Sequence, residues 1–162
     1  MNDALIGQGT KQISLADIEP VIRELLASGG AFVMTITGTS MTPTLIDHRD
    51  RVTLKQADLP LRRGDLPLYR RDNGQYVLHR VIGVQADGSY TCCGDHQWVP
   101  EPGIRDDQII GCTVKITRNG KCFSVQKRCY RLWVSFWLLC LKWRKHLLRF
   151  YYFFRRKKQK PS

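Results

Sequence analysis

The chain of 162 residues is long enough for one folded domain with short appendages, and 43% of its residues are hydrophobic, an ordinary share for a globular protein. Its net charge of +12 is unevenly distributed. Residues 1–110 hold 11 Lys and Arg residues and all 14 Asp and Glu residues, whereas residues 111–162 hold the other 15 basic residues and no acidic one. A partner that recognises positive charge is therefore expected at the C-terminal third.

The six cysteines contain no Cys-x-x-Cys pair, and no histidine stands at zinc-ligand spacing from them. We therefore expect no structural metal and no cofactor. Their positions also lack the pattern of a disulfide framework, and no secretory signal is evident at the N-terminus. Reduced thiols in a cytosolic environment are the expectation.

Residues 1–30 are predicted to form a helical lead-in. Ser14 is a candidate N-cap, and Ser28-Gly29-Gly30 ends the pattern. A single helix leaves no room for a DNA-reading helix-turn-helix before the strand that begins at residue 32, so we expect the helix to pack on a sheet. Apolar residues recur at helical spacing: Leu15, Ile18, Ile22, Leu25 and Leu26.

Residues 31–126 alternate between short strand patterns and turn signals, which indicates a mainly β domain. Pro67 lacks a backbone donor and is expected to confine its strand to a sheet edge. Asn-Gly and Asp-Gly turns occur at 73–74, 87–88 and 119–120. The predicted strands are 32–38, 51–55, 66–70, 75–84, 89–93, 109–117 and 121–126.

The segment Gly38-Thr39-Ser40-Met41-Thr42-Pro43-Thr44-Leu45 follows the first of these strands. It resembles the nucleophile box Gly-x-Ser-Met-x-Pro of type I signal peptidases and their LexA-like relatives. The resemblance covers about residues 32–118 and implies a signal-peptidase/LexA-like β domain. Further segments resemble the later boxes of the family in the same order: Gly64-Asp65, Leu78-His79-Arg80-Val81-Ile82-Gly83, Gly94-Asp95 and Asp107-Gln108-Ile109-Ile110-Gly111.

The resemblance implies that Ser40 is a nucleophile and that His79 is its general base. A serine hydroxyl is a poor nucleophile until a neighbouring base takes its proton. Bacterial signal peptidases typically use lysine as that base, whereas this chain has histidine, which is largely neutral near pH 7 without being desolvated. A lone histidine in a strand is more often structural, but the serine box favours the catalytic reading. The other histidines, His48, His96 and His146, have no comparable context.

The oxyanion of acyl transfer would be held by the backbone N–H of Ser40 and a second donor. Some signal peptidases supply it from a serine two residues before the nucleophile. That position is Gly38 here, so another group, for example Thr39, would have to serve.

Asp95 is our candidate to orient His79, with an ordinary turn aspartate as the competing reading. The family's late box continues with Asn and with Ser or Asp residues, whereas this chain continues His96-Gln97-Trp98-Val99-Pro100-Glu101. Glu101 and Asp107 are therefore kept as alternatives. Asp65 is expected to serve the turn at Gly64.

The substrate of such a site would be a protein or peptide, extended along the strand that leads to Ser40 and bound by main-chain hydrogen bonds. By resemblance, small residues are preferred before the cleaved bond.

Residues 127–162 form a basic, aromatic tail. The apolar run from Leu132 to Leu141 is too short to span a bilayer, and its extension to Phe154 includes several charges. We expect an amphipathic helix that binds an anionic membrane surface through residues 127–160. Helix packing on the β domain and binding of single-stranded nucleic acid are the alternatives, the latter disfavoured. The residues expected on one side are Trp133, Phe136, Trp137, Cys140, Leu141, Leu147, Leu148 and Tyr151.

The sequence thus predicts a membrane-associated serine endopeptidase with a Ser-His dyad and a cytoplasmic peptidase domain. Signal peptidases are membrane enzymes with an N-terminal anchor, which we do not expect in this sequence. An active site carried on a surface-bound C-terminal helix would face the cytosol, so cleavage of exported signal sequences is not the expected role. A catalytically silent peptide- or nucleic-acid-binding module with the same fold is the alternative. A self-cleaving repressor is disfavoured because no DNA-binding domain precedes the peptidase-like region.

Overall fold

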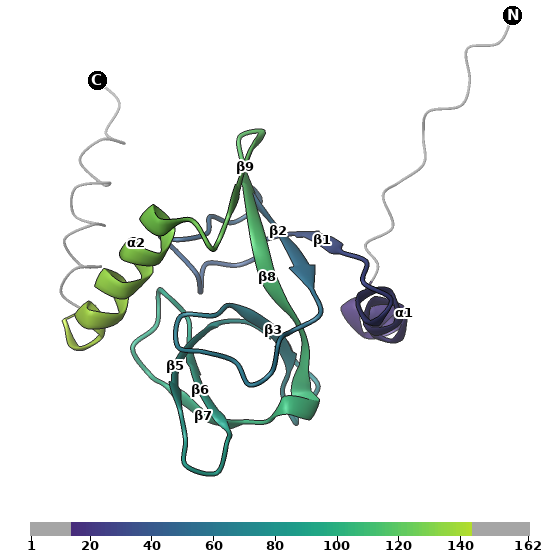
Figure 1. The fold of residues 1–162 in the computed structure, drawn as a ribbon, viewed down its shortest axis with the longest axis horizontal. Coiled ribbons are helices and arrows are strands. Elements are labelled where there is room, and N and C mark those ends of the chain that lie inside the picture. The colour runs from purple at the N-terminus through teal and green to yellow at the C-terminus, as the bar shows by residue number, and fades with distance from the viewer. Residues whose placement is uncertain (1–13, 144–162) are drawn as a thin grey trace, which may run out of the picture.

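The computed structural model describes residues 14–143, which form a mainly β structure with two α-helices (Figure 1). Two short 3-10 turns, Asp106–Gln108 and Cys140–Lys142, complete the regular structure. In chain order the elements are α1 (Leu15–Ala27), β1 (Phe32–Thr35), β2 (Asp50–Lys55), β3 (Pro67–Arg70), β4 (Tyr76–Leu78), β5 (Arg80–Val84), β6 (Tyr90–Cys93), β7 (Glu101–Ile104), β8 (Ile109–Arg118), β9 (Lys121–Ser124) and α2 (Arg128–Leu139).

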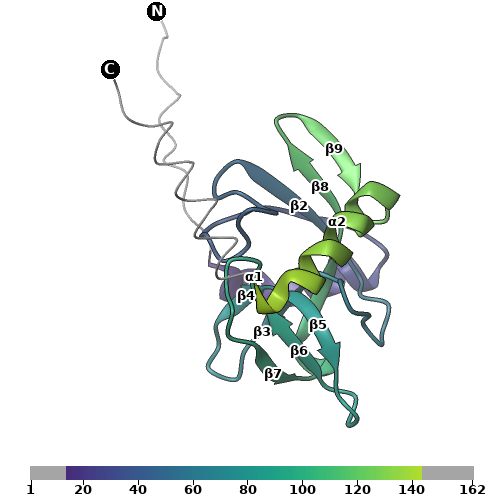
Figure 2. The same cartoon turned by 90° about the vertical axis from the view of Figure 1, so that its left-hand side faces the viewer.

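The strands form two antiparallel sheets. The larger sheet has the order β1-β2-β8-β3-β4, with β9 also paired to β8, and it curls into a half-barrel. The smaller sheet has the order β5-β6-β7. Strand β8 is ten residues long and pairs with β2, β3 and β9, so it is the central support of the larger sheet. Figure 2 shows the two sheets with α2 lying across them.

Helix α1 packs on the larger sheet, as the sequence predicted. Its N-cap is Ser14, whose hydroxyl accepts a hydrogen bond from the Ala16 N–H at 3.2 Å. Ile22 and Leu26 are buried in the core. A Cβ at Gly111 of β8 would lie 2.6 Å from Cδ1 of Leu26, so the close contact between helix and strand requires glycine there.

Two hydrophobic clusters hold the sheets. One lies under α1 and the larger sheet, and the other between the two sheets. Burial of these aliphatic and aromatic side chains supplies the main stabilisation. The first cluster is built from Ile22, Leu26, Ile36, Met41, Leu45, Val52, Leu54, Leu66, Leu68, Ile110 and Ile116. The second is built from Leu61, Tyr69, Val81, Tyr90, Cys92, Ile104 and Ile109.

Three features of the sheets differ from the prediction. The prediction that Pro67 marks an edge strand is wrong, because β3 pairs with both β8 and β4. Pro67 is the first residue of β3, a position that tolerates proline even inside a sheet. The predicted strand 75–84 is interrupted at His79, which separates β4 from β5. Strand β7 was not predicted, because Pro102 and Gly103 give it the composition of a loop.

Helix α2 packs on the domain through Val134, Trp137 and Leu138, which are buried. Its apolar residues are therefore divided between two faces, and the prediction that Trp137 shares one side with Phe136 is wrong, since Phe136 is exposed. The predicted contributions of Leu147, Leu148 and Tyr151 lie outside the described residues. Within residues 14–143, no helix has the length and apolar character that a membrane crossing requires.

Candidate active site

Ser40 lies in the turn that follows β1, and its neighbours anchor that turn in the core. Met41 and Leu45 are buried in the first cluster. Gly38 has a φ of 86°, a left-handed conformation that favours glycine, and its N–H donates a 2.8 Å hydrogen bond to Oδ1 of Asp47. The serine is thus presented from a turn that is fixed on both sides.

Asp50, at the start of β2, organises the rest of this loop. Its carboxylate accepts hydrogen bonds from the Ile46 N–H at 3.0 Å and from the guanidinium groups of Arg49 and Arg118, both at 2.8 Å. Burial alone would raise the pKa of Asp50, but these donors lower it to about 2. Arg118 also donates to the carbonyl oxygen of Thr44 at 2.7 Å, so β8 holds the loop through a charged network.

The Gly94-Asp95 segment contacts the backbone of Ser40 directly. The His96 N–H donates a 2.8 Å hydrogen bond to the carbonyl oxygen of Ser40. A Cβ at Gly94 would lie only 2.6 Å from that oxygen. The glycine is therefore required for close approach of two loops that are more than fifty residues apart in the sequence.

His79 lies where the chain passes from β4 of the larger sheet to β5 of the smaller one, and it is buried. Burial disfavours the charged imidazolium, while Glu101 raises the pKa and Arg71 lowers it; the net effect is a pKa of about 4. His79 is accordingly neutral near pH 7, which is the form that can accept a proton.

Ser40 and His79 line the same cavity, which has a volume of about 440 Å³. Strands from the two ends of the larger sheet contribute to its walls: Met34 comes from β1, and Tyr76 and Leu78 come from β4. Within residues 14–143, the structure has no hydrogen bond between the Ser40 hydroxyl and His79. The two predicted residues are thus brought to one cavity without being directly bonded.

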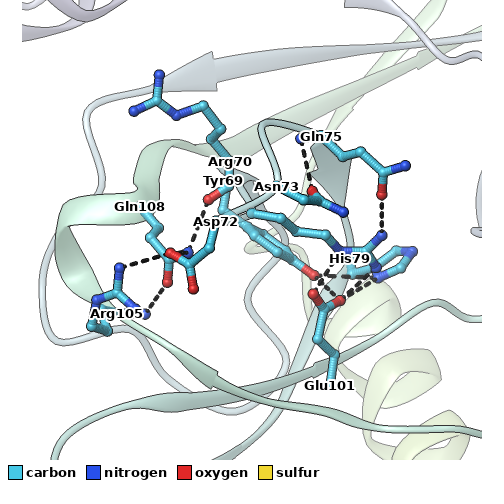
Figure 3. Close-up of polar contacts among 10 residues, drawn as sticks. Tyr69, Arg70, Asp72, Asn73, Gln75, His79, Glu101, Arg105 and Gln108 are labelled. Atoms are coloured by element: carbon cyan, nitrogen blue, oxygen red, sulfur yellow. Dashed lines mark hydrogen bonds and ion pairs between the residues drawn. The ribbon is translucent and has the colours of Figure 1, made fainter.

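The Nδ1 side of His79 faces a polar cluster, which Figure 3 shows. Nδ1 lies 3.4 Å from the hydroxyl oxygen of Tyr69 and 3.9 Å from Oε2 of Glu101. The Tyr69 hydroxyl donates a 2.8 Å hydrogen bond to Glu101. Because the proton of Tyr69 is directed to the carboxylate, its oxygen is available to accept from an Nδ1–H of His79. That tautomer leaves the Nε2 lone pair as the base.

Glu101 is held as a carboxylate by Arg71, which donates to Oε1 at 2.6 Å and to Oε2 at 2.7 Å. Burial alone would raise the pKa of Glu101, but hydrogen bonds from Arg71 and Tyr69 bring it below its ordinary value. Burial raises the pKa of Tyr69, so its hydroxyl remains a donor. The negative charge beside His79 is therefore stable at neutral pH and would favour an imidazolium formed during a reaction.

Asp95, the predicted orienting residue, is bonded to Arg80 instead. Its two oxygens accept from Arg80 at 3.0 and 2.6 Å, and both side chains are fully buried. Arg80 also donates to the carbonyl oxygen of Gly64 at 3.1 Å and contacts the Tyr130 hydroxyl at 3.4 Å. Asp95 thus neutralises a buried cation that ties β5 to the Gly64 turn and to α2.

The other acidic candidates differ in their distance from His79 and in their bonding partners. Glu101 lies beside His79, whereas Asp107 is exposed and pairs with Arg105 at 3.2 Å. Asp65 accepts from the Arg62 N–H at 2.7 Å and so serves the turn, as predicted. Tyr69 and Arg71 were not singled out as site residues, although a buried tyrosine needs a polar partner and Arg71 follows it closely in the chain.

Two groups near Ser40 could donate to an oxyanion. Among the described residues, the Ser40 N–H donates to no other group, so no protein acceptor competes for it. Gly38 is committed to Asp47, and the side chain of Thr39 is exposed. Gln97, which the sequence analysis did not identify, lines the cavity beside Ser40.

Across residues 14–143, no group of three or more His, Cys, Asp or Glu side chains is arranged to hold a metal ion.

Comparison of the chain with models of known protein families found no match, and a search of curated proteins found no related sequence.

Proposed function

We propose that the chain is a serine endopeptidase in which Ser40 is the nucleophile and His79 is the general base. One observation carries the proposal: both side chains line one cavity, and His79 is buried and neutral with its Nδ1 side engaged by Tyr69 and Glu101. We further propose that the domain has the signal-peptidase/LexA-like fold, which the order of the sequence boxes and the curled larger sheet support.

In the proposed reaction, the Ser40 oxygen attacks the scissile carbonyl carbon while Nε2 of His79 takes the hydroxyl proton. His79 then donates that proton to the leaving amine, and water hydrolyses the resulting ester by the reverse proton path. The oxyanion is stabilised by the Ser40 N–H, and Gln97, which lines the same cavity, is the candidate for a second donor.

Glu101 assists by favouring the charged form of His79 while it carries the proton. Its carboxylate lies 3.9 Å from Nδ1, and Arg71 fixes its position through two hydrogen bonds. The proposed orienting residue is therefore Glu101 rather than Asp95.

The proposed substrate is an extended segment of a protein or peptide. Strands β1 and β4 are the two ends of the larger sheet, and the cavity has residues of both in its walls. Each end strand offers backbone groups that an added strand can pair with. A peptide bound in this way would pass Ser40 after β1 and His79 after β4.

The second candidate is a peptide-binding module without catalysis. The observation that favours it is the missing hydrogen bond between Ser40 and His79 in the described structure. Catalytic hydrogen bonds are often long without substrate and shorten in its complex, so the enzyme remains our first proposal.

The test is hydrolysis of a mixed peptide library by the full chain and by Ser40→Ala, with Ser135→Ala, an exposed serine of α2, as the matched control. The proposal expects cleavage by the wild type and Ser135→Ala, and its loss in Ser40→Ala. Peptide binding without cleavage by any of the three would support the silent module. Equal cleavage by all three would exclude Ser40 as the nucleophile.

A further inference from the structure

Helix α2 and the turn that follows it carry two apolar faces, and among the described residues 14–143 one of these faces packs on the domain while the other is exposed. The inner face consists of Val134, Trp137 and Leu138, which are buried. Four large side chains at positions i, i+4, i+7 and i+11 form a stripe on the opposite face, which we call the outer stripe. Its members and exposed fractions are Leu132 (71%), Phe136 (53%), Leu139 (77%) and Trp143 (69%).

The outer stripe is held at a fixed orientation on the domain. Nε1 of Trp133 lies 3.3 Å from Oγ1 of Thr44, and the Tyr130 hydroxyl contacts Arg80 at 3.4 Å. A Cβ at Gly64 would lie 3.2 Å from Val134, so the inner face is closely packed there. The stripe therefore points away from the β domain because the opposite face of the helix is fastened to it.

The surroundings of the outer stripe are cationic. Lys127, Arg128 and Arg131 are exposed on and beside the first turns of α2. The sequence contains no acidic residue after Asp107, and residues 127–162 hold 12 Lys and Arg residues. Large apolar side chains flanked by positive charge are the combination that binds the headgroup region of an anionic bilayer.

We infer that the outer stripe docks α2 onto an anionic lipid surface, lying in the plane of the interface. Each leucine or aromatic side chain that leaves water for the bilayer interface contributes to binding, and the basic residues add attraction to anionic headgroups. A second copy of the chain fits less well, because its contact would bring like charges together. Single-stranded nucleic acid also fits less well, because Leu132 and Leu139 offer no ring on which a base could stack.

The experiment is co-sedimentation of the full chain with vesicles of phosphatidylcholine containing about 30% phosphatidylserine. The variant Leu132→Gln/Leu139→Gln removes half of the outer stripe and retains helix propensity. The matched control is Val21→Gln, which changes an exposed apolar residue of α1. Thermal unfolding of all three proteins verifies that they are folded.

The proposal expects wild type and Val21→Gln to bind equally, and binding to weaken as salt is raised. It expects the double variant to bind at least about tenfold more weakly. Absence of wild-type binding, or equal binding by the double variant, would overturn it. A dimer or an oligonucleotide complex that the double substitution abolishes would also overturn it, since the stripe would then have another occupant. Because none of these readouts is peptide hydrolysis, the result is independent of the proposed enzyme.

Discussion

Oε2 of Glu101 lies 3.9 Å from Nδ1 of His79, and the Tyr69 hydroxyl contacts both groups, at 2.8 Å from the carboxylate and 3.4 Å from the imidazole. A carboxylate at this place favours the imidazolium, whereas burial favours the neutral imidazole. The balance of these two effects sets the pKa of His79, and with it the pH range in which the imidazole is free to accept a proton.

Glu101→Gln is expected to slow peptide hydrolysis by about tenfold or more, because the imidazolium loses its neighbouring negative charge. Glu101 raises the pKa of His79, so its removal shifts the pKa further down. The acid limb of the rate profile, which is expected near pH 4 in the wild type, should therefore move to lower pH. Rates measured from pH 3 to 8 test this, with exposed Glu24→Gln as the control. An acid limb that moves to higher pH would contradict the role given to Glu101.

Asp95→Asn is expected to act on stability. The substitution leaves the buried guanidinium of Arg80 without its carboxylate, which should lower the free energy of unfolding by about 3–5 kcal/mol. The hydrolysis rate per folded molecule should fall less than in Glu101→Gln. Urea denaturation and activity of the folded fraction separate the two effects. A stable Asp95→Asn protein with a greater loss of rate would return the orienting role to Asp95.

His79 should make the fold less stable in mild acid. Its pKa is about 4 in the folded chain and about 6.5 when unfolded, so the unfolded state binds the proton first as pH falls. Stability is expected to decrease by about 3 kcal/mol between pH 6.5 and 4 and to show no further contribution from His79 below that. The difference between wild type and His79→Gln isolates this effect from the carboxylates that titrate in acid. A difference that does not vary with pH would contradict the burial of a neutral imidazole.

Gly94→Ala is expected to displace the loop that carries Ser40, the proposed nucleophile, since the new Cβ would lie 2.6 Å from the Ser40 carbonyl oxygen. Displacement of a reacting group by about 1 Å lowers rates about a hundredfold. Gly83→Ala is the control, because its Cβ would find its nearest neighbour at 4.0 Å. Peptide hydrolysis together with circular dichroism tests the pair. Equal rates for both variants would mean that the contact between Gly94 and Ser40 does not position the nucleophile.

The strands of the β domain were predictable where local signals agreed with their surroundings. Asn73-Gly74 lies in the turn between β3 and β4, and Asn119-Gly120 lies between β8 and β9. Both glycines have positive φ, as such turns demand. Ser14 was also predictable as an N-cap, because a helix cap depends only on residues close to it in the sequence.

The missed features depend on partners that are distant in the sequence. Pro67 is accommodated in an interior strand because it is the first residue of β3, which pairing with β8 determines. Glu101 belongs to β7, which pairs with β6 although Pro102 and Gly103 give it the composition of a loop. The sequence kept Glu101 as an alternative to Asp95, but its contact with His79 depends on the pairing of β7 with β6, which no local pattern indicates. The motif suggested that Asp95 orients His79, whereas its pairing with Arg80 is visible only in the folded structure.

The most direct test of the central claim is to trap the covalent intermediate at Ser40. An intact library peptide that the chain is found to cleave would be mixed with the full chain, and the reaction would be quenched in acid within one turnover. The quenched chain would then be digested, and its peptides would be analysed by mass spectrometry. We predict an ester between the N-terminal fragment of the peptide and the Ser40 hydroxyl, formed more slowly in His79→Gln and absent from Ser40→Ala. Peptide cleavage that persists in Ser40→Ala, or an adduct on another residue, would contradict the account.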